Sequence, residues 1–318
     1  MKKIGSILLA LSLLAVLFTV CAPDKPADDP ANEKLRVVAT IFPQYDFLRS
    51  IAGGNIELSM LLSPGSESHS FEPTPQDIIK IQNCDMFVYV GGESDVWIDD
   101  ILASMDVSKK QIVSLMDLVD TVEEELLPGM EDDHGHEEEH EEPELDEHVW
   151  TAPKNAAKIV QALSDKLCTL DADNAETYKQ NTTACLAKLD TLDKAFRAAV
   201  DGGSRKTLVF ADRFPFRYFA DSYGLTPFAA FPGCATETQA SASTVTGLID
   251  KVKAEKIPVV FTIEFSDGKL ADTICEATDA KKLQLHSCHN ISKADFDSGL
   301  DYLSLMTQNV ENLKEALK

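Results

Sequence analysis

An internal repeat constrains the fold of this chain more than any other feature of its 318 residues. Strand-like apolar runs ending at Ile41 and Phe210 each lead into a Phe-Pro pair followed by further aromatic residues. Three motifs recur in the same order at offsets of 168 to 172 residues, namely Pro43 with Pro215, Pro64-Gly65 with Pro232-Gly233, and Lys109-Lys110 with Lys281-Lys282. A series that keeps nearly one offset indicates a duplicated unit. We therefore expect two lobes of related topology.

Each half of the repeat alternates short apolar runs with amphipathic stretches. Strands joined by helices form parallel sheets covered on both faces, so the predicted fold class is α/β, with a mostly parallel sheet flanked by helices in each lobe. The expected strands are Arg36–Ile41, Glu57–Leu62, Met86–Val90 and Gln111–Val113 in the first lobe, and Thr207–Phe210, Pro227–Phe231, Val259–Ile263 and Leu283–Leu285 in the second.

One long helix is expected between the lobes. From Asn174 to Val200, apolar residues follow one another at spacings of seven, four, three and four, at Tyr178, Cys185, Leu189, Leu192 and Phe196. This period predicts a single helix of roughly 40 Å, at ~1.5 Å per residue, ended by Gly202-Gly203. The expected division is an N-terminal lobe over 34–173, a stiff linking helix over 174–202 and a C-terminal lobe over 203–318.

The N-terminus has the pattern of an export signal. Lys2 and Lys3 precede an uncharged apolar stretch from Ile4 to Val20, which is too short for a confident membrane span. Cys21 stands where a bacterial lipoprotein signal places its lipid-modified cysteine, and a Pro- and Asp-rich tether over 21–33 follows. We expect an exported protein, at the cell surface or in the periplasm, anchored through Cys21. Because Val20 is larger than the residue such signals prefer, ordinary secretion with cleavage nearby stays open.

The run 131–147 holds eleven acidic residues, three histidines and no lysine or arginine. Leu145 alone cannot bury enough surface to offset the entropy of ordering, so we expect a flexible loop. Acids by themselves would indicate only a solvated tract, and a calcium or magnesium loop would need only oxygen ligands. Imidazole is a common zinc ligand, so His134, His136 and His140 favour an auxiliary metal-binding loop.

Charge and cysteine spacing exclude several classes of partner and site. The net charge of −24 makes nucleic acid and anionic lipid headgroups unsuitable partners. Six cysteines follow Cys21 without any Cys-x-x-Cys pair, so they form no zinc ribbon. In an oxidising compartment they allow one or two disulfides.

Ligands of parallel α/β sheets lie just outside the carboxyl ends of the strands. The ionisable residues at those places are His69, Glu237, Glu264, Asp267, His286 and His289.

The repeat relates two of these candidates. His69 lies five residues beyond Pro64, and Glu237 lies five residues beyond Pro232, so equivalent loops carry a histidine and a carboxylate. A single histidine at such a place is more often a surface or satisfied core residue. All seven histidines, however, lie in the acidic run, in these loops, or at His148 directly after the run. That distribution favours a metal site in the cleft between the lobes.

These features resemble the metal-specific substrate-binding proteins of bacterial ABC transporters, in particular the zinc and manganese uptake class. The resemblance covers nearly all of 34–318. Its marks are the His69 loop with Phe71-Glu72-Pro73-Thr74-Pro75-Gln76-Asp77, the stretch Asp146-Glu147-His148-Val149-Trp150, the long helix and the acidic His-rich insertion. The resemblance implies that His69 and His148 bind the metal, and that zinc (Zn2+) rather than manganese (Mn2+) is the cargo.

The second lobe departs from the family pattern. The resemblance implies a third ligand, His or Glu, where this chain has Arg213, and a guanidinium has no lone pair to donate. For the fourth ligand Asp267 matches best, with Glu264 close by, and Glu237 and His286 are further candidates. Arg213 or Arg217 pairing with a carboxylate such as Glu237 is an equal alternative, which would remove that carboxylate from the ligands. Cys288 could offer a thiolate, but a disulfide with Cys234 is the expectation.

The expected function is capture of zinc outside the cytoplasm and delivery to an ABC transporter permease, with small movements of the lobes, by a non-enzymatic and monomeric protein. A manganese-binding homologue, or a surface adhesin or metal-buffering lipoprotein without a transport role, is the alternative. A zinc metallohydrolase is a remote one, because the chain has no His-Glu-x-x-His, Gly-x-Ser-x-Gly or phosphate-binding Gly-Lys-Ser/Thr motif.

Overall fold

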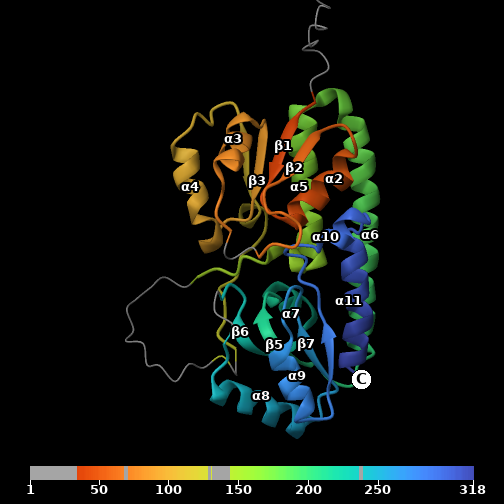
Figure 1. The fold of residues 1–318 in the computed structure, drawn as a ribbon. Helices are drawn as coiled ribbons and strands as arrows, with labels where there is room; N and C mark the ends of the chain where they lie inside the picture. The colour runs from red at the N-terminus through yellow and green to blue at the C-terminus, as the bar shows by residue number, and fades with distance from the viewer. Residues whose placement is uncertain (1–33, 68–70, 128–129, 131–143, 236–238) are drawn as a thin grey trace, which may run out of the picture. The chain divides into compact units, whose positions relative to one another are not determined.

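Two four-stranded parallel sheets form the frame of the molecule (Figure 1). This computed structural model describes residues 34–67, 71–127, 130, 144–235 and 239–318. The sheets have the orders β2-β1-β3-β4 and β6-β5-β7-β8. Their strands are β1 (Arg36–Ala39), β2 (Glu57–Met60), β3 (Met86–Tyr89), β4 (Gln111–Ser114), β5 (Thr207–Phe214), β6 (Thr226–Pro232), β7 (Val259–Thr262) and β8 (Lys281–Gln284). The identical strand order confirms the two related lobes predicted from the repeat.

All eight predicted strands are present, and β5 differs most from its prediction. It continues to Phe214, although the apolar pattern predicts an end at Phe210. The pairing of β5 with β6 shifts between Phe210 and Arg213, and such an irregularity lets the strand run on through polar residues. Arg213 therefore lies at the end of a strand and not in the loop after it.

Helices connect the strands and cover both faces of each sheet. The α-helices are α2 (Phe42–Ala52), α3 (Pro75–Asn83), α4 (Val96–Ala103), α5 (Pro153–Leu170), α6 (Ala175–Asp201), α7 (Arg217–Tyr223), α8 (Ala242–Glu255), α9 (Lys269–Glu276), α10 (Lys293–Asp297) and α11 (Tyr302–Ala316). Short 3₁₀ turns are η2 (Glu93–Asp95), η3 (Met116–Leu118), η4 (Val149–Thr151) and η5 (Ala172–Asn174). The predicted α/β layers are confirmed.

The long helix α6 is the predicted link between the lobes, and α11 runs beside it (Figure 1). All five apolar positions that predicted this helix are buried, at Tyr178, Cys185, Leu189, Leu192 and Phe196. They belong to one hydrophobic core that includes residues of both sheets, while separate apolar clusters lie under α3 and α4 and under α8 and α9.

Local sequence signals set the start of helix α3. The Thr74 hydroxyl accepts a hydrogen bond from the backbone N–H of Asp77, and the Asp77 carboxylate accepts one from the N–H of Thr74 (3.1 Å). With Pro75 in the first turn, this is a capping box. Part of the motif that marks the family resemblance thus serves to begin a helix.

The segment 144–147 is ordered, although it belongs to the predicted flexible loop. Leu145 forms a bridge with Glu123, and the backbone N–H of Asp146 donates to the carbonyl of Val122 at 2.9 Å. Asp146 and Glu147 are both buried. Residues 144–147 therefore do not form part of a flexible loop, and the rest of the acidic run, 131–143, lies outside the described residues.

The cysteines do not pair as predicted. Cys234 and Cys288 are both free thiols, and Cys288 is fully buried. Burial raises the pKa of both thiols, which favours their protonated form. The other four cysteines that the structure describes are free as well.

Within the described ranges, every helix is too short or too polar to cross a membrane.

Candidate metal centre

The carboxyl ends of strands from both lobes border one small cavity. Its volume of about 20 Å³ is enough for a single water molecule or metal ion and far too small for an organic ligand. The lining residues include Ser66 and Glu67 after β2, Arg213 at the end of β5, Gly233 after β6, Glu264 after β7, and Ser287 and His289 after β8. The cavity thus lies where ligands of parallel α/β sheets are expected, just outside the carboxyl ends of the strands.

His148 lies fully buried at the start of η4, against the turn that contains Gly233. A side chain at Gly233 would place its Cβ 2.9 Å from Cε1 of His148, so only glycine fits there. Oδ1 of Asp146 lies 3.2 Å from Nδ1 of His148 and accepts its backbone N–H at 2.8 Å. A carboxylate beside Nδ1 favours the tautomer with hydrogen on that nitrogen, so the lone pair is on Nε2, the nitrogen that would bind a metal.

The pKa of His148 reflects two opposed causes. Burial of the ring lowers the pKa, but the Asp146 carboxylate and its hydrogen bond raise it, and the net pKa lies above its usual value. Protons therefore compete with a metal for this ring at a higher pH than for a solvated histidine.

His289, from the second lobe, lies directly beside His148. The two ring centroids are 5.3 Å apart at an interplanar angle of 87°, and the indole of Trp150 is 5.0 Å from the His289 ring. Trp150 Nε1 donates to the carbonyl of Ser287 at 2.8 Å, which ties the two lobes together at this point. Its position after a predicted strand made His289 a candidate, but His289 was not among the ligands predicted from the sequence.

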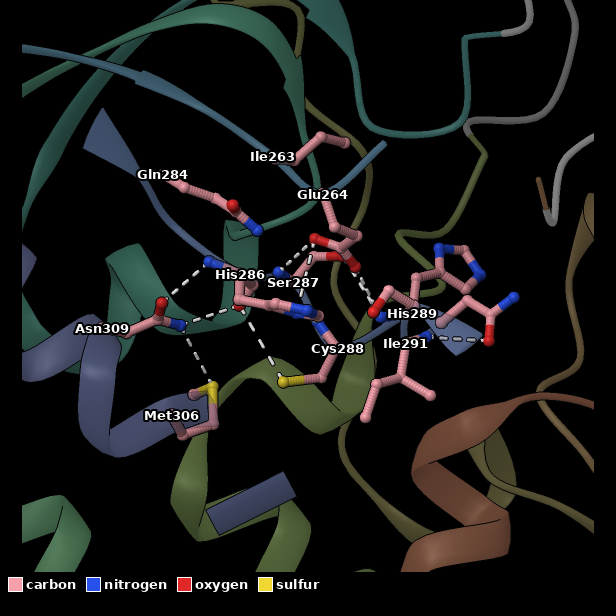
Figure 2. A network of polar contacts seen from close by, with 12 residues as sticks. Ile263, Glu264, Gln284, His286, Ser287, Cys288, His289, Ile291, Met306 and Asn309 are labelled. Carbon is pink, nitrogen blue, oxygen red and sulfur yellow. Dashed lines mark hydrogen bonds and ion pairs between the residues drawn. The ribbon is translucent and has the colours of Figure 1, made fainter. Parts of the chain in front are cut away.

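Glu264, a predicted ligand that lines the cavity, holds the loop that carries His289 (Figure 2). Its Oε2 accepts the backbone N–H of Ser287 at 2.8 Å, and its Oε1 accepts the Ser287 hydroxyl at 2.6 Å and the N–H of His289 at 3.0 Å. The carboxylate is buried, so these three bonds satisfy a group that would otherwise be costly to desolvate.

His286, another predicted ligand, is built into the same loop. Its Nδ1 accepts the backbone N–H of Cys288 at 2.9 Å, and Asn309 bonds to both its N–H and its carbonyl (Figure 2). A ring that accepts at Nδ1 while neutral carries its hydrogen on Nε2. In this arrangement the His286 ring keeps no lone pair for a metal.

Asp267 is exposed and does not line the cavity. Its carboxylate accepts from Lys269 Nζ at 2.6 Å and from the Lys269 N–H at 3.0 Å. These hydrogen bonds lower the pKa of Asp267. The structure thus separates Asp267 from the histidines.

Arg213 forms an ion pair across the lobe boundary. Its Nη1 and Nη2 donate to Oε1 and Oε2 of Glu67 at 3.2 and 2.9 Å. Arg217 pairs with Glu125 and Asp221 instead. Arg213 thus pairs with a carboxylate, as one of the two sequence alternatives proposed. The partner is Glu67, which lies 146 residues away in the sequence, and no sequence pattern indicated this contact.

Buried carboxylates surround His148 on the first lobe. Glu124 Oε1 accepts the backbone N–H of Gly233 at 2.9 Å, and Glu147 Oε1 accepts that of Ser94 at 2.7 Å. Burial raises the pKa of both groups. Together with Asp146 they place carboxylates around His148, and such a group of acids attracts a divalent cation.

Asp95, close to Glu147, gives a testable pH dependence. Its Oδ2 accepts the N–H groups of Val90 and Gly91 at 2.8 and 3.0 Å, and burial raises its pKa to about 7. Because the folded state binds this proton more tightly than the unfolded state does, stability is lost as pH rises from about 4 through about 7. Asp95→Asn keeps one acceptor oxygen and should raise the free energy of unfolding by about 2 kcal/mol at pH 8.

Urea unfolding at pH 8 and pH 5 checks this result. The gain should be clearly smaller at pH 5, because most of the loss of stability between about pH 4 and about pH 7 has not yet occurred there. An equal gain at both pH values would contradict the raised pKa.

Several predicted groups lie outside the described residues: His69, Glu237, His134, His136, His140 and Cys21. Among the residues that the structure describes, no three His, Cys, Asp or Glu side chains are grouped so that they could hold a metal ion by themselves. The described part of the site therefore supplies the His148–His289 pair, and the full ligand set stays a prediction.

Two α/β lobes of one topology, a single long helix between them and a small polar cavity at the strand ends define a two-lobed solute-binding fold. The family model described as "Zinc-uptake complex component A periplasmic" (ZnuA) matches residues 37–316. The chain belongs to this family, whose members are solute-binding proteins of zinc uptake.

Individual relatives agree with the family. The chain is 33% identical over 318 residues to the zinc-binding lipoprotein AdcA of Streptococcus pneumoniae, covering 99% of this chain but 61% of that protein. It is 31% identical over 327 residues to the high-affinity zinc uptake system protein ZnuA of Bacillus subtilis, covering 99% and 98%. The Zn(II)-bound ZnuA-like domain of S. pneumoniae AdcA superposes with a TM-score of 0.73 at 29% identity, covering 89% of this chain and 99% of that domain.

Proposed function

We propose that this protein captures zinc between its lobes outside the cytoplasm and delivers it to an ABC transporter permease. The observation that carries the proposal is the pair of imidazoles, His148 and His289, which come from opposite lobes and lie 5.3 Å apart between ring centroids. Asp146 orients the first ring, and Glu264 fixes the loop of the second. A metal bound there contacts both lobes and favours their closed arrangement.

We further propose a ligand set of His148, His289 and, from the family resemblance, His69. Zinc is commonly four-coordinate with nitrogen, oxygen and sulfur ligands, so a water or one more protein group completes it. Glu264 and His286 serve as supports of the His289 loop, and Asp267 takes no part. Three imidazoles suit zinc better than manganese, which prefers oxygen ligands and lies lower in the affinity order of divalent metals.

We propose supporting roles for residues 131–143 and for Cys21. The run 131–143 would raise the local zinc concentration near the cleft. A lipid on Cys21 would keep the protein at the membrane, next to its permease, and the protein would act as a monomer. No catalytic step is proposed.

Competition calorimetry on the chain lacking residues 1–21 tests the proposal. We expect one tight zinc site per chain, with zinc preferred to manganese by about 100-fold or more. A site that binds manganese as tightly as zinc would favour the manganese alternative instead.

Deleting residues 131–143 should remove only weak zinc binding. The tight site should keep its affinity within about threefold, because separate sites interact little. The deletion leaves 144–147 in place, since Asp146 orients His148. Calorimetric titration of both proteins measures the stoichiometry, and loss of the tight site on deletion would place that site in the loop.

A further inference from the structure

The Arg213–Glu67 ion pair has a geometry that suits a role in metal selection. Two parallel N–H to oxygen bonds, at 3.2 and 2.9 Å, hold both oxygens of Glu67, and Arg213 Nη1 also reaches the carbonyl of Ala235 at 3.4 Å. The Arg213 side chain is 11% exposed and that of Glu67 is 39% exposed. A guanidinium presents its N–H donors in a planar fork that matches the two oxygens of a carboxylate.

Both members of the pair line the same small cavity as His289. The carboxylates among the described lining residues are Glu67 and Glu264. Glu264 is held by three hydrogen bonds from Ser287 and His289. Glu67 is held by Arg213. Each of these two carboxylates is therefore engaged by another group, and His289 presents an imidazole among the described lining residues.

We infer that Arg213 is a specificity-determining residue, which withholds the Glu67 carboxylate from the metal and so keeps oxygen-preferring cations from binding well. This inference rests on the proposed function, because it takes the cavity to be the cargo site. Mn2+ binds best where carboxylate oxygens join the ligands, whereas zinc is satisfied by nitrogen ligands. A carboxylate released into the cavity benefits manganese more than zinc.

The loss of positive charge by itself predicts a different result, so it can be told apart from the release of an oxygen ligand. Removing a guanidinium near the cavity lessens its repulsion of every divalent cation, and this raises the affinity for zinc and manganese alike. Only a new oxygen ligand changes the ratio of the two affinities. The ratio of dissociation constants is therefore the quantity to measure, rather than either affinity.

The test compares zinc and manganese dissociation constants for wild type, Arg213→Met, and Arg213→Met combined with Glu67→Gln. Methionine keeps much of the length of arginine without its charge. We expect Arg213→Met to reduce the preference for zinc by about tenfold or more, the scale on which partners of metal ligands act. The added Glu67→Gln should restore the wild-type ratio, because the oxygen ligand is weakened. An unchanged ratio in Arg213→Met would overturn the inference.

Two further variants keep the test decisive. Arg217→Met is the matched control, since Arg217 belongs to the same lobe but pairs with Glu125 and Asp221 outside the lining residues, and it should leave the ratio unchanged. If Arg213→Met does not fold, Arg213→Lys keeps the charge but loses the two-pronged hold, and should give a smaller change in the same direction. No change in a folded Arg213→Lys would then count against the inference. Failure of wild type to bind zinc would instead refute the proposed function.

Discussion

Replacing His148 with alanine should weaken zinc binding by at least about 100-fold. The ring is fully buried, its Nδ1 is held by Asp146, and its Nε2 is the nitrogen that this tautomer offers to a metal. Loss of a direct ligand should exceed the 10- to 100-fold cost of losing a ligand's hydrogen-bond partner. His289→Ala should have an effect of the same order, since the two rings lie together. Competition titration with a zinc chelator measures both constants.

Two matched variants control this prediction. Asp267→Ala removes an exposed carboxylate that sequence reasoning ranked as a ligand but that pairs with Lys269, and its zinc affinity should equal that of wild type. His286→Ala removes a ring bound to the N–H of Cys288. It should lower the free energy of unfolding and have little effect on the preference for zinc over manganese. Wild-type zinc affinity in His148→Ala would sink the proposed site.

The fold could be predicted from the sequence because its signals are local and repeated. Each strand is a short apolar run, and the linking helix shows a period of about 3.6 residues over many turns. The internal repeat then predicts that the two lobes share a related topology. The continuation of β5 to Phe214 was missed because Asp212 and Arg213 interrupt its apolar pattern, and a strand irregularity carries the pairing past them.

The candidate site could be predicted only in part. Strand ends located the loops that line the cavity, since topology brings those ends together. Sequence could not say which way each side chain turns within a loop. In the stretch from His286 to His289, one ring turns back onto the backbone of Cys288 and the other meets His148. The partner of Arg213 was equally hidden, because a contact between Glu67 and Arg213 depends on how the lobes meet.

Glu264→Gln should lower zinc affinity by about 10- to 100-fold while leaving the metal's ligands unchanged. The wild-type Oε1 accepts from Ser287 Oγ and His289 N, while Oε2 accepts from Ser287 N. A glutamine amide has one oxygen acceptor, and its NH2 group would face an N–H donor. The loop should therefore lose part of its fixed position, and His289 with it. Titration with zinc gives the affinity, and Co2+ bound in its place reports the ligands through its visible absorption.

The Co2+ spectrum separates a positioning residue from a ligand. If Glu264 only positions His289, the Co2+ bands keep their energies in Glu264→Gln and only the dissociation constant rises. If Glu264 binds the metal, its loss shifts the bands, because the number or type of ligand atoms changes. Ser287→Ala removes one of the three donors to the same carboxylate without changing Glu264 itself, so it should weaken zinc binding in the same direction and by less. A spectral shift in Glu264→Gln together with an unaffected Ser287→Ala would return Glu264 to the ligand set.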